Sequence, residues 1–511
     1  MQRLICIILL LLKSSAIVYG SRTDLLSCLR SSGVTNVTTQ SNALQFDSLF
    51  RYSLQNLRFT EPCVHRPQMI IVPQSKIQVL KAVGCSIQYG WEIRVRSGGH
   101  SYEGLSSTSD APHFVIIDLM AVDNVHVDVT SSTAWVEAGA TLGQVYAAIA
   151  EKTRRLGFPA GICPTVGSTG HFAGGGLGIL TRKYGLAADN VIDVLLVTAA
   201  GEVLNRKSMG KHLFWAVRGG GGGSWGIVLA WKIRLVSVPS TVTAFTVLKT
   251  GRDSVTEAVH RWQYVAPNLE KDLFMRVQVF GVEQMGKKKI RASFHGMYLG
   301  PQDELLSKVK ESFPELGMAA ADCQEMSWIE SVAYFAGTNL SDLSNRYYSG
   351  KNFFKNKSDF ARKPLPKSAL RGLWPMLENE VGGNIIMSPL GGFMNETPST
   401  ALPFPHRAGN LFDIQYVLTW YEEGNNARHV EWMRNLYRYM SPYVSHSPRA
   451  AYVNYPDLDL GFSANGLSSV EEAKAWGEKY FLGNFDRLVK VKSQIDPHNI
   501  FRNAQSIPVL K

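Results

Sequence analysis

The sequence lacks three features that would each point to a large functional class. After residue 20, no segment offers about 18 apolar residues in a row, so no membrane-spanning helix is predicted. The net charge is +11, but Lys and Arg are scattered with one short run at 287–289, so nucleic-acid binding is not expected. No Gly-x-Gly-x-x-Gly follows the first predicted strand and opens a helix, which excludes a Rossmann unit. No metal site is predicted either.

Cysteine is also scarce, with 6 residues in a chain of 511. Cys6 falls in the N-terminal segment 1–20, where Arg3, an apolar run at 4–12 and small residues before Ser21 indicate a cleaved secretory signal. The remaining cysteines are Cys28, Cys63, Cys85, Cys163 and Cys323. An odd number cannot all pair, so at least one thiol stays outside any disulfide. Sequons at Asn36, Asn339, Asn356 and Asn395 fit secretion and suggest surface loops.

Glycine, in contrast, is concentrated in two loops, at 96–106 and 161–178. Such density lets the backbone approach a ligand closely, so that successive N–H groups can bind a pyrophosphate. Each loop also holds one reactive side chain. His100 is a nitrogen nucleophile, and Cys163 becomes a thiolate nucleophile if nearby positive charge lowers its pKa.

The remaining pattern predicts an α+β protein. In the first half, strands are predicted at 67–73, 92–96, 115–119, 134–138 and 194–197, with helices at 75–89 and 142–156, the latter ending at Gly157. From residue 241 the pattern changes to long alternating strands, such as 273–280, 290–299 and 410–420, separated by helices such as 303–313. This mixture predicts an antiparallel sheet backed by helices.

The order of three motifs along the chain indicates a protein family. The chain has Arg-Ser-Gly-Gly-His-Ser at 96–101, then Cys-Pro-Thr-Val-Gly at 163–167, then three glycines at 174–176. This order resembles the berberine bridge enzyme-like family, secreted plant flavoproteins with a vanillyl-alcohol-oxidase-type FAD domain. The resemblance runs from about Cys28 to Phe501. It implies FAD bonded to both His100 and Cys163, and secretion to the apoplast or delivery to the vacuole.

The resemblance also implies a domain organisation with a discontinuous PCMH-type FAD domain. The expected segments are a signal peptide at 1–20, an N-terminal helical segment of the FAD domain at 21–65, the FAD-binding domain at 66–240, a substrate-binding domain at 241–450 and a return to the FAD domain at 451–511. Family spacing pairs Cys28 with Cys85. Cys63 and Cys323 are then either a second bridge or, as we favour, free buried thiols.

Carried over residue by residue, the resemblance names the site. The expected cofactor-binding residues are His100, Cys163, Arg96, Ser97, Gly98, Gly99, Ser101, Gly167, Gly174, Gly175, Asn190 and Val191. Five glycines at 219–223 are expected to run alongside the cofactor. Val166 stands where valine in the family goes with O2 reactivity, which favours an oxidase; the alternative is an ordinary core contact.

Proton removal from the substrate needs a base near the flavin. By resemblance this is Tyr455, provided that its surroundings favour the phenolate; the alternative is a structural tyrosine. Gln278 and Gln415 fall where family members contact substrate.

Two departures bear on the substrate. Leu177 stands where many members have an aromatic residue, and Asp413 stands where the monolignol-oxidising members have lysine. An apolar Leu177 favours bulky aromatic or prenylated substrates. The pair Ser168-Thr169 also departs from the family pattern, with no predicted effect.

Three hypotheses follow for the function. The favoured one is a monomeric FAD-linked oxidase that takes hydride from a phenolic, alkaloid or prenylated aromatic small molecule and passes electrons to O2, giving H2O2, with ring or diene formation as one outcome. The second is an oxidase of sugars or simple aromatic alcohols. The third is a non-redox cyclase that retains FAD.

Overall fold

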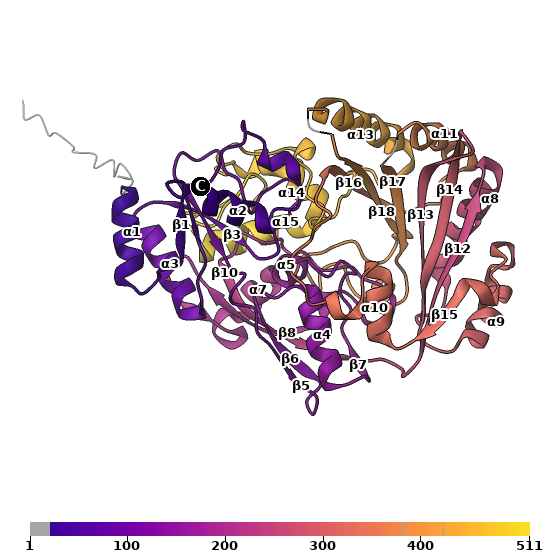
Figure 1. The fold of residues 1–511 in the computed structure, drawn as a ribbon, viewed down its shortest axis with the longest axis horizontal. Coiled ribbons are helices and arrows are strands. Elements are labelled where there is room, and N and C mark those ends of the chain that lie inside the picture. Colours follow the sequence, from indigo (N-terminus) through magenta and orange to yellow (C-terminus); the bar gives the residue numbers. More distant parts are fainter. Residues whose placement is uncertain (1–20, 381, 423, 511) are drawn as a thin grey trace, which may run out of the picture.

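The computed structural model describes residues 21–380, 382–422 and 424–510. The predicted signal peptide, 1–20, lies outside the described residues. Two lobes are visible in Figure 1: one combines the N-terminal and C-terminal parts of the chain, and the other holds the middle. In the described part of the chain, no helix has the length and apolar character needed to cross a membrane.

The first sheet is built from the N-terminal third of the chain. Its order is β1 (Val37–Thr39), β2 (Met69–Ile71), β4 (Phe114–Asp118) and β3 (Glu92–Arg96). β2, β4 and β3 are parallel, and helix α3 (Lys76–Gln88) crosses between β2 and β3. The prediction of a purely helical segment at 21–65 is incomplete. Besides α1 (Arg22–Ser31) and α2 (Ala43–Ser53), this segment adds the β-branched strand β1, which pairs antiparallel with β2.

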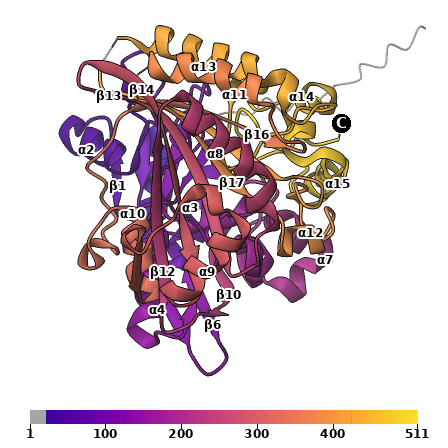
Figure 2. The ribbon, with the colours of Figure 1, turned by 90° about the vertical axis from the view of Figure 1, so that its right-hand side faces the viewer.

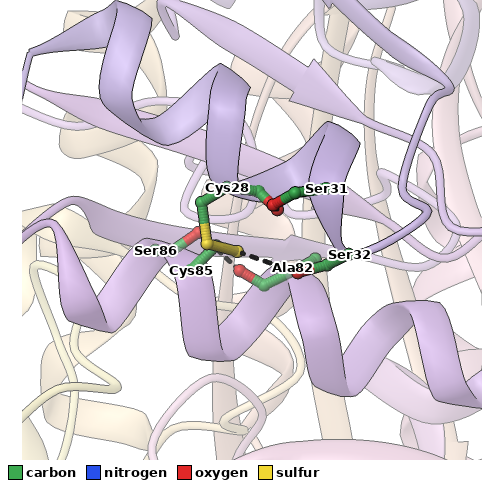
Figure 3. The surroundings of a disulfide bond; sticks show 6 residues. All are labelled: Cys28, Ser31, Ser32, Ala82, Cys85 and Ser86. Carbon is green, nitrogen blue, oxygen red and sulfur yellow. Dashed lines mark hydrogen bonds between the residues drawn. A yellow bond between two sulfur atoms is a disulfide. The ribbon is translucent and has the colours of Figure 1, made fainter.

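One disulfide ties α1 to α3, as Figure 3 shows. It joins Cys28 and Cys85, which confirms the expected pair. Cys63 and Cys323 are both free, so no second bridge forms. The expectation that they are buried is wrong, because Cys63 is exposed and Cys323 is half-buried.

The second sheet of this lobe is antiparallel. Its order is β5 (Val125–Asp128), β6 (Thr133–Glu137), β10 (Ile227–Arg234), β8 (Val191–Val197) and β9 (Val203–Leu204). Helix α4 (Leu142–Lys152) ends four residues earlier than predicted, because Leu156 and Gly157 form strand β7 against β11 (Val236–Ser237). The Gly157 backbone also lies against Trp328, where a Cβ atom would come within 2.9 Å of the indole. Further helices are α5 (Ser168–Ala173), α6 (Thr181–Tyr184), α7 (Arg206–Val217) and α12 (Phe393–Glu396).

The middle of the chain forms one antiparallel sheet of 7 strands, as predicted. Its order is β15 (Cys323–Met326), β12 (Val242–Thr250), β14 (Lys287–Tyr298), β13 (Leu273–Gln284), β17 (Gly383–Pro389), β18 (Phe412–Trp420) and β16 (Phe353–Ala361). Helices α8 (Arg252–Val265), α9 (Gln302–Ser312), α11 (Lys367–Glu378) and α13 (Asn426–Met440) lie on the side of the sheet away from the first lobe (Figures 1 and 2). The opposite face is turned toward the first lobe.

The last sixty residues return to the first lobe, where they appear in yellow beside the indigo elements of Figure 1. Helices α14 (Val470–Phe481) and α15 (Phe485–Ile495) place Trp476, Phe485 and Leu488 in the same core as the N-terminal sheets. Helix α10 (Trp328–Ala336) belongs to the middle of the sequence but packs into this same core through Trp328 and Ile329.

The sequons differ in exposure. Asn36, Asn339 and Asn395 are exposed, which agrees with the expected surface positions. Asn356 is buried within strand β16, so the prediction of a surface loop is wrong there.

Candidate active site

One cavity of about 550 Å³ lies where the first lobe, the face of the seven-stranded sheet and the C-terminal return meet. This volume is typical of small-molecule and cofactor sites. Many of the predicted site residues line it: Ser97, Gly98, Gly99, His100, Ser101, Cys163, Val166, Gly167, Gln415 and Tyr455. Residues from Gly220 to Gly226 form a further part of the wall, as expected of the glycine run.

Other predicted residues do not line this cavity: Arg96, Gly174, Gly175, Asn190, Val191 and Gln278. Three of them make contacts within the protein. Arg96 is fully buried in an ion pair of 2.6 Å with Asp118, and Asn190 donates to the carbonyls of Tyr184 and Leu186. Gln278 donates to the side chain of Asn384 at 3.3 Å. Arg96, Asn190 and Gln278 therefore hold the protein structure around the cavity.

The two glycine loops touch each other through their backbones. A Cβ atom at Gly98 would lie 2.1 Å from the Gly167 nitrogen, so no larger residue fits at this crossing. The Cys163 loop is also tied to the start of α4, because the N–H groups of Leu142 and Gly143 donate to the carbonyls of Val166 and Pro164. These contacts fix both loops relative to one another.

One hydroxyl group links the two predicted attachment residues. Thr165 Oγ1 lies 3.0 Å from His100 Nε2 and 3.7 Å from Cys163 Sγ. Burial, together with the positive charges of Lys351 and Arg346, lowers the pKa of His100 to about 4. The imidazole is therefore neutral at pH 7, which is the nucleophilic form.

The environment of Cys163 differs from the one that the sequence predicts. Its side chain is exposed to the cavity, yet the surrounding protein encloses it, and burial raises the pKa of the thiol. Hydrogen bonds with Thr165 and Val166 lower the pKa and so oppose the effect of burial. Among the described residues, no cation adds to this lowering. The expectation of a thiolate favoured by nearby cations is therefore wrong for the protein alone.

Part of the cavity wall is bare backbone. A Cβ atom at Gly170 would meet nothing within 4 Å, and one at Gly222 would meet only Ala173, at 4.0 Å. Both glycines line the cavity, so their missing side chains leave room for a ligand. With His100 and Cys163 on the same cavity, the residues fit an FAD held at two points.

Sequence reasoning missed several residues that line the cavity. His171, in the second glycine loop, accepts a hydrogen bond of 3.0 Å from the Gly161 N–H, and burial lowers its pKa to about 4. Tyr102 directly follows the first loop, and its pKa rises with burial. Their position in or next to the glycine motifs could have identified them as cavity residues, whereas their residue types alone could not.

The aromatic part of the cavity is centred on Tyr455. Its ring stacks on Tyr102 at 5.4 Å between centroids and meets Tyr452 edge-on at 4.9 Å. Gln415 Nε2 donates to the Tyr102 hydroxyl at 2.8 Å. Burial raises the pKa of Tyr455 well above its ordinary value, and Tyr102, Asp413 and Tyr452 add to the rise. In the protein alone, the surroundings of Tyr455 therefore favour the phenol over the phenolate.

The residues that depart from the family pattern are also at this site. Leu177, Thr169 and Asp413 line the cavity, whereas Ser168 is buried at the start of α5. Thr169 Oγ1 accepts a hydrogen bond of 3.1 Å from the Trp231 indole.

Comparison with known proteins agrees with this geometry. A profile described as "FAD binding domain" matches residues 67–206, and one described as "Berberine and berberine like" matches residues 451–508. A "Tetrahydroberberine oxidase" from Berberis wilsoniae is 46% identical over 496 residues, which cover 95% of this chain and 93% of the relative. "Monolignol oxidoreductase AtBBE-like 13" from Arabidopsis thaliana is 46% identical over 480 residues, covering 92% and 89%.

Among solved structures, the berberine bridge enzyme from Eschscholzia californica matches with a TM-score of 0.91 and 43% identity, covering 95% of this chain and 99% of the other. The α+β architecture, the FAD cavity and these matches lead to one conclusion. The chain belongs to the berberine bridge enzyme-like family of FAD-dependent oxidoreductases.

Proposed function

We propose that this protein is a secreted FAD-linked oxidase of phenolic, alkaloid or prenylated aromatic compounds, with O2 as electron acceptor and H2O2 as product. The observation that carries the proposal is the shared cavity. His100 and Cys163 meet at Thr165 on one side of it, and Tyr455 and Gln415 line the same cavity from the C-terminal return and β18. A cofactor attached at the loops would therefore share one space with a substrate held over the sheet.

In this proposal His100 and Cys163 both hold FAD covalently, which keeps the cofactor in an open site. When bound, FAD supplies the hydride acceptor and passes the electrons on. The protein's part is to orient the substrate. Tyr455 supplies an apolar ring and a neutral hydroxyl, and Gln415 fixes the neighbouring Tyr102 through its hydrogen bond.

The assignment of O2 as acceptor rests on Val166. It lines the cavity directly after Thr165 in the attachment loop, and its short branched side chain is half-buried. A longer side chain there would extend further into the cavity and hinder access of O2.

The substrate class rests on Leu177 and Asp413, which replace the aromatic residue and the lysine of monolignol-oxidising relatives. Leu177 adds apolar surface to a cavity that is already lined by four tyrosines, Tyr102, Tyr452, Tyr455 and Tyr480. This composition favours aromatic rings over sugars, whose hydroxyl groups need many polar partners. Oxidation of sugars or simple alcohols is therefore the second candidate, and non-redox cyclisation the third.

Secretion as a monomer completes the proposal. The disulfide between Cys28 and Cys85 forms in oxidising compartments, and the exposed Asn36, Asn339 and Asn395 suit glycosylation there. The apoplast or the vacuole is the expected destination.

The proposal is tested with an oxygen electrode and a peroxide assay. Holoenzyme is offered matched panels of simple phenols, prenylated phenols, benzylisoquinoline alkaloids, cinnamyl alcohols and sugars. Oxygen uptake with equimolar H2O2 is expected for members of the first three panels. Turnover of cinnamyl alcohols or sugars alone would contradict the proposed substrate class.

A further inference from the structure

The first lobe carries a second hollow besides the active-site cavity. It has a volume of about 680 Å³, and among the described residues the two share no lining residue. The C-terminal end of α7 separates them, because Val217 lines the cavity whereas its neighbour Arg218 lines the hollow. Val191, which the sequence predicts as a cofactor-binding residue, lies here and not in the cavity. The hollow is therefore distinct from the proposed flavin site.

Positive charge dominates the wall of this hollow. The charged residues come from α7, from the end of β10 and from α15, and α15 lies beside α7 (Figure 2). They are Arg206, Lys207, Lys211, Arg218, Arg234 and Arg487. We call these six residues, with the space between them, the basic recess. Because they come from distant parts of the sequence, the sequence alone does not predict the recess.

The charges of the basic recess are not neutralised within the protein. In the part of the chain that the structure describes, none of the six cations forms an ion pair. The one acidic side chain in the described wall is Asp189, and its two oxygens each accept a hydrogen bond of 2.9 Å from Arg407, which lies outside the wall. The recess therefore presents an excess of positive charge to a ligand.

Two of the arginines are held in place by aromatic rings. Arg218 Nε donates to the Phe214 carbonyl at 3.0 Å, and its Cζ lies 4.0 Å from the centroid of the Phe214 ring. Arg487 Cζ lies 3.8 Å from the centroid of the Trp215 ring. Guanidinium groups that are already ordered lose little conformational entropy when they bind an anion.

Arg206 adds a second positive charge beside Arg218. Its Cζ lies 5.0 Å from the centroid of the same Phe214 ring, and its guanidinium donates to the Ile192 carbonyl at 3.1 Å. Burial lowers the pKa of Arg218 to about 10; Asp189 opposes this shift and Arg206 adds to it. Both arginines stay charged at pH 7 and repel each other. An anion bound to both would remove this repulsion.

The size and charge of the basic recess indicate the kind of anion that fits. Phe214 and Trp215 are almost fully buried, so neither offers a free ring on which a nucleic-acid base could stack. An acidic polysaccharide brings a single carboxylate with each sugar unit. A phosphate monoester carries about two negative charges at pH 7, so about three such groups on one molecule balance the cations of the recess. A compact molecule with several phosphates therefore fits best.

We propose that the basic recess binds a soluble small molecule that carries several phosphate monoester groups, of the inositol polyphosphate class. Arg206 and Arg218 bind one phosphate between them, and Arg487 binds a second. Lys207, Lys211 and Arg234 are exposed and neutralise the remaining charge. The ligand is bound without covalent change, and the site does not depend on the proposed oxidase function.

The first test measures binding to holoenzyme by calorimetry, with inositol hexakisphosphate as the probe. Inorganic phosphate and an oligogalacturonate with six carboxylates serve as comparison probes. The hexakisphosphate should bind about 100-fold more tightly than inorganic phosphate, because several charged hydrogen bonds form on one molecule. Affinity no higher than that of inorganic phosphate would overturn the proposal, as would tighter binding of the oligogalacturonate.

The pH dependence of binding tests the phosphate chemistry itself. The second proton of a phosphate monoester leaves near about pH 6, so the probe gains negative charge between pH 5 and pH 7 while the arginines and lysines keep theirs. Affinity for the hexakisphosphate should therefore rise by about tenfold over this range. Affinity for the oligogalacturonate, which is ionised throughout, should stay nearly constant. A hexakisphosphate affinity that does not rise would contradict the assignment.

Matched variants test the location of the site. The combined variant Lys207→Gln, Lys211→Gln and Arg234→Gln changes only exposed residues and should weaken hexakisphosphate binding by about 10- to 100-fold. The control, Lys287→Gln, Lys288→Gln and Lys289→Gln, removes the same net charge from β14, outside the recess. It should leave the affinity nearly unchanged. Equal weakening in both variants would show non-specific attraction to a basic protein and would overturn the site.

Vesicles distinguish a soluble ligand from a lipid headgroup of the same chemistry. Holoenzyme is sedimented with phosphatidylcholine vesicles that contain phosphatidylinositol 4,5-bisphosphate. We expect the protein to stay in the supernatant. Sedimentation that is lost in the combined recess variant, but kept in the β14 control, would overturn the assignment to a soluble ligand.

Discussion

The two ends of the cavity are built in different ways. The cofactor end consists of backbone from two glycine loops and two reactive side chains, His100 and Cys163, that meet at Thr165. The other end, which we call the substrate end because we propose that the substrate binds there, consists of side chains from separate strands, with Arg276 from β13 and Asp413 from β18. Backbone dominates the cofactor end, whereas the other end presents the charged side chains of Arg276 and Asp413.

The two ends therefore differ in how their function is written in the sequence. The cofactor end is recognisable from short sequence motifs, because continuous stretches of backbone form it. The substrate end depends on single residues that change without disturbing the sheet. Predictions about the first therefore concern retention of FAD, and predictions about the second concern rate and pH.

The largest effect is expected at the cofactor end. Each of His100→Ala and Cys163→Ala should still precipitate yellow in acid, because one bond remains. The double variant should release nearly all of its FAD into the supernatant, where absorbance measures it. Free FAD released from the wild type under the same treatment would contradict attachment at either residue.

At the substrate end, Tyr455→Phe tests the tyrosine that the sequence predicted as base. Because burial keeps Tyr455 protonated, loss of its hydroxyl should slow flavin reduction by only about tenfold, a barrier change of ~1.4 kcal/mol. Anaerobic stopped-flow mixing with substrate measures this rate. A fall of about 10²–10⁴-fold would support Tyr455 as the base.

Val166→Leu lies between the two ends and should affect the two half-reactions unequally. The longer side chain should slow reoxidation by O2 by about tenfold, equivalent to ~1.4 kcal/mol, and leave flavin reduction nearly unchanged. Rapid mixing of reduced enzyme with air-saturated buffer measures the first, and anaerobic mixing with substrate measures the second. Equal slowing of both would identify Val166 as a packing residue.

The smallest effect concerns stability. Burial raises the pKa of Asp413 to about 7, above its value of about 3.9 in an unfolded chain. The folded state therefore binds more protons between about pH 4 and pH 7, and this group lowers stability as pH rises through that window. Asp413→Asn removes the penalty, so its Tm should exceed that of the wild type by a few degrees at pH 8 and by less at pH 5. A Tm difference that stays constant across this range would show that Asp413 does not titrate there.

The sequence predicted most of the cofactor end and little of the substrate end. Strand β3, the two glycine loops and the Cys28–Cys85 pair follow from local patterns and family spacing, and the structure confirms them. The motifs predict Arg96 and Asn190 in the cofactor site; in the structure Arg96 pairs with Asp118 and Asn190 donates to a backbone carbonyl, and neither lines the cavity.

The substrate end could not be predicted because it depends on strand register and burial. Arg276 and Asp413 are far apart in sequence, and only the order β13, β17, β18 brings them to one row. The sequence identified Asp413 as a departure but not as a buried carboxylate without a partner. It also predicted Tyr455 as the base on the condition that its surroundings favour the phenolate, and burial among other tyrosines opposes that form.

Anaerobic mixing of holoenzyme with a phenolic substrate tests the central claim most directly. The account predicts that the flavin absorbance bleaches in the absence of O2 and returns when air is admitted, with one H2O2 formed for each substrate oxidised. Conversion of the substrate while the flavin stays oxidised would contradict it, because the protein would then be a non-redox cyclase that retains FAD.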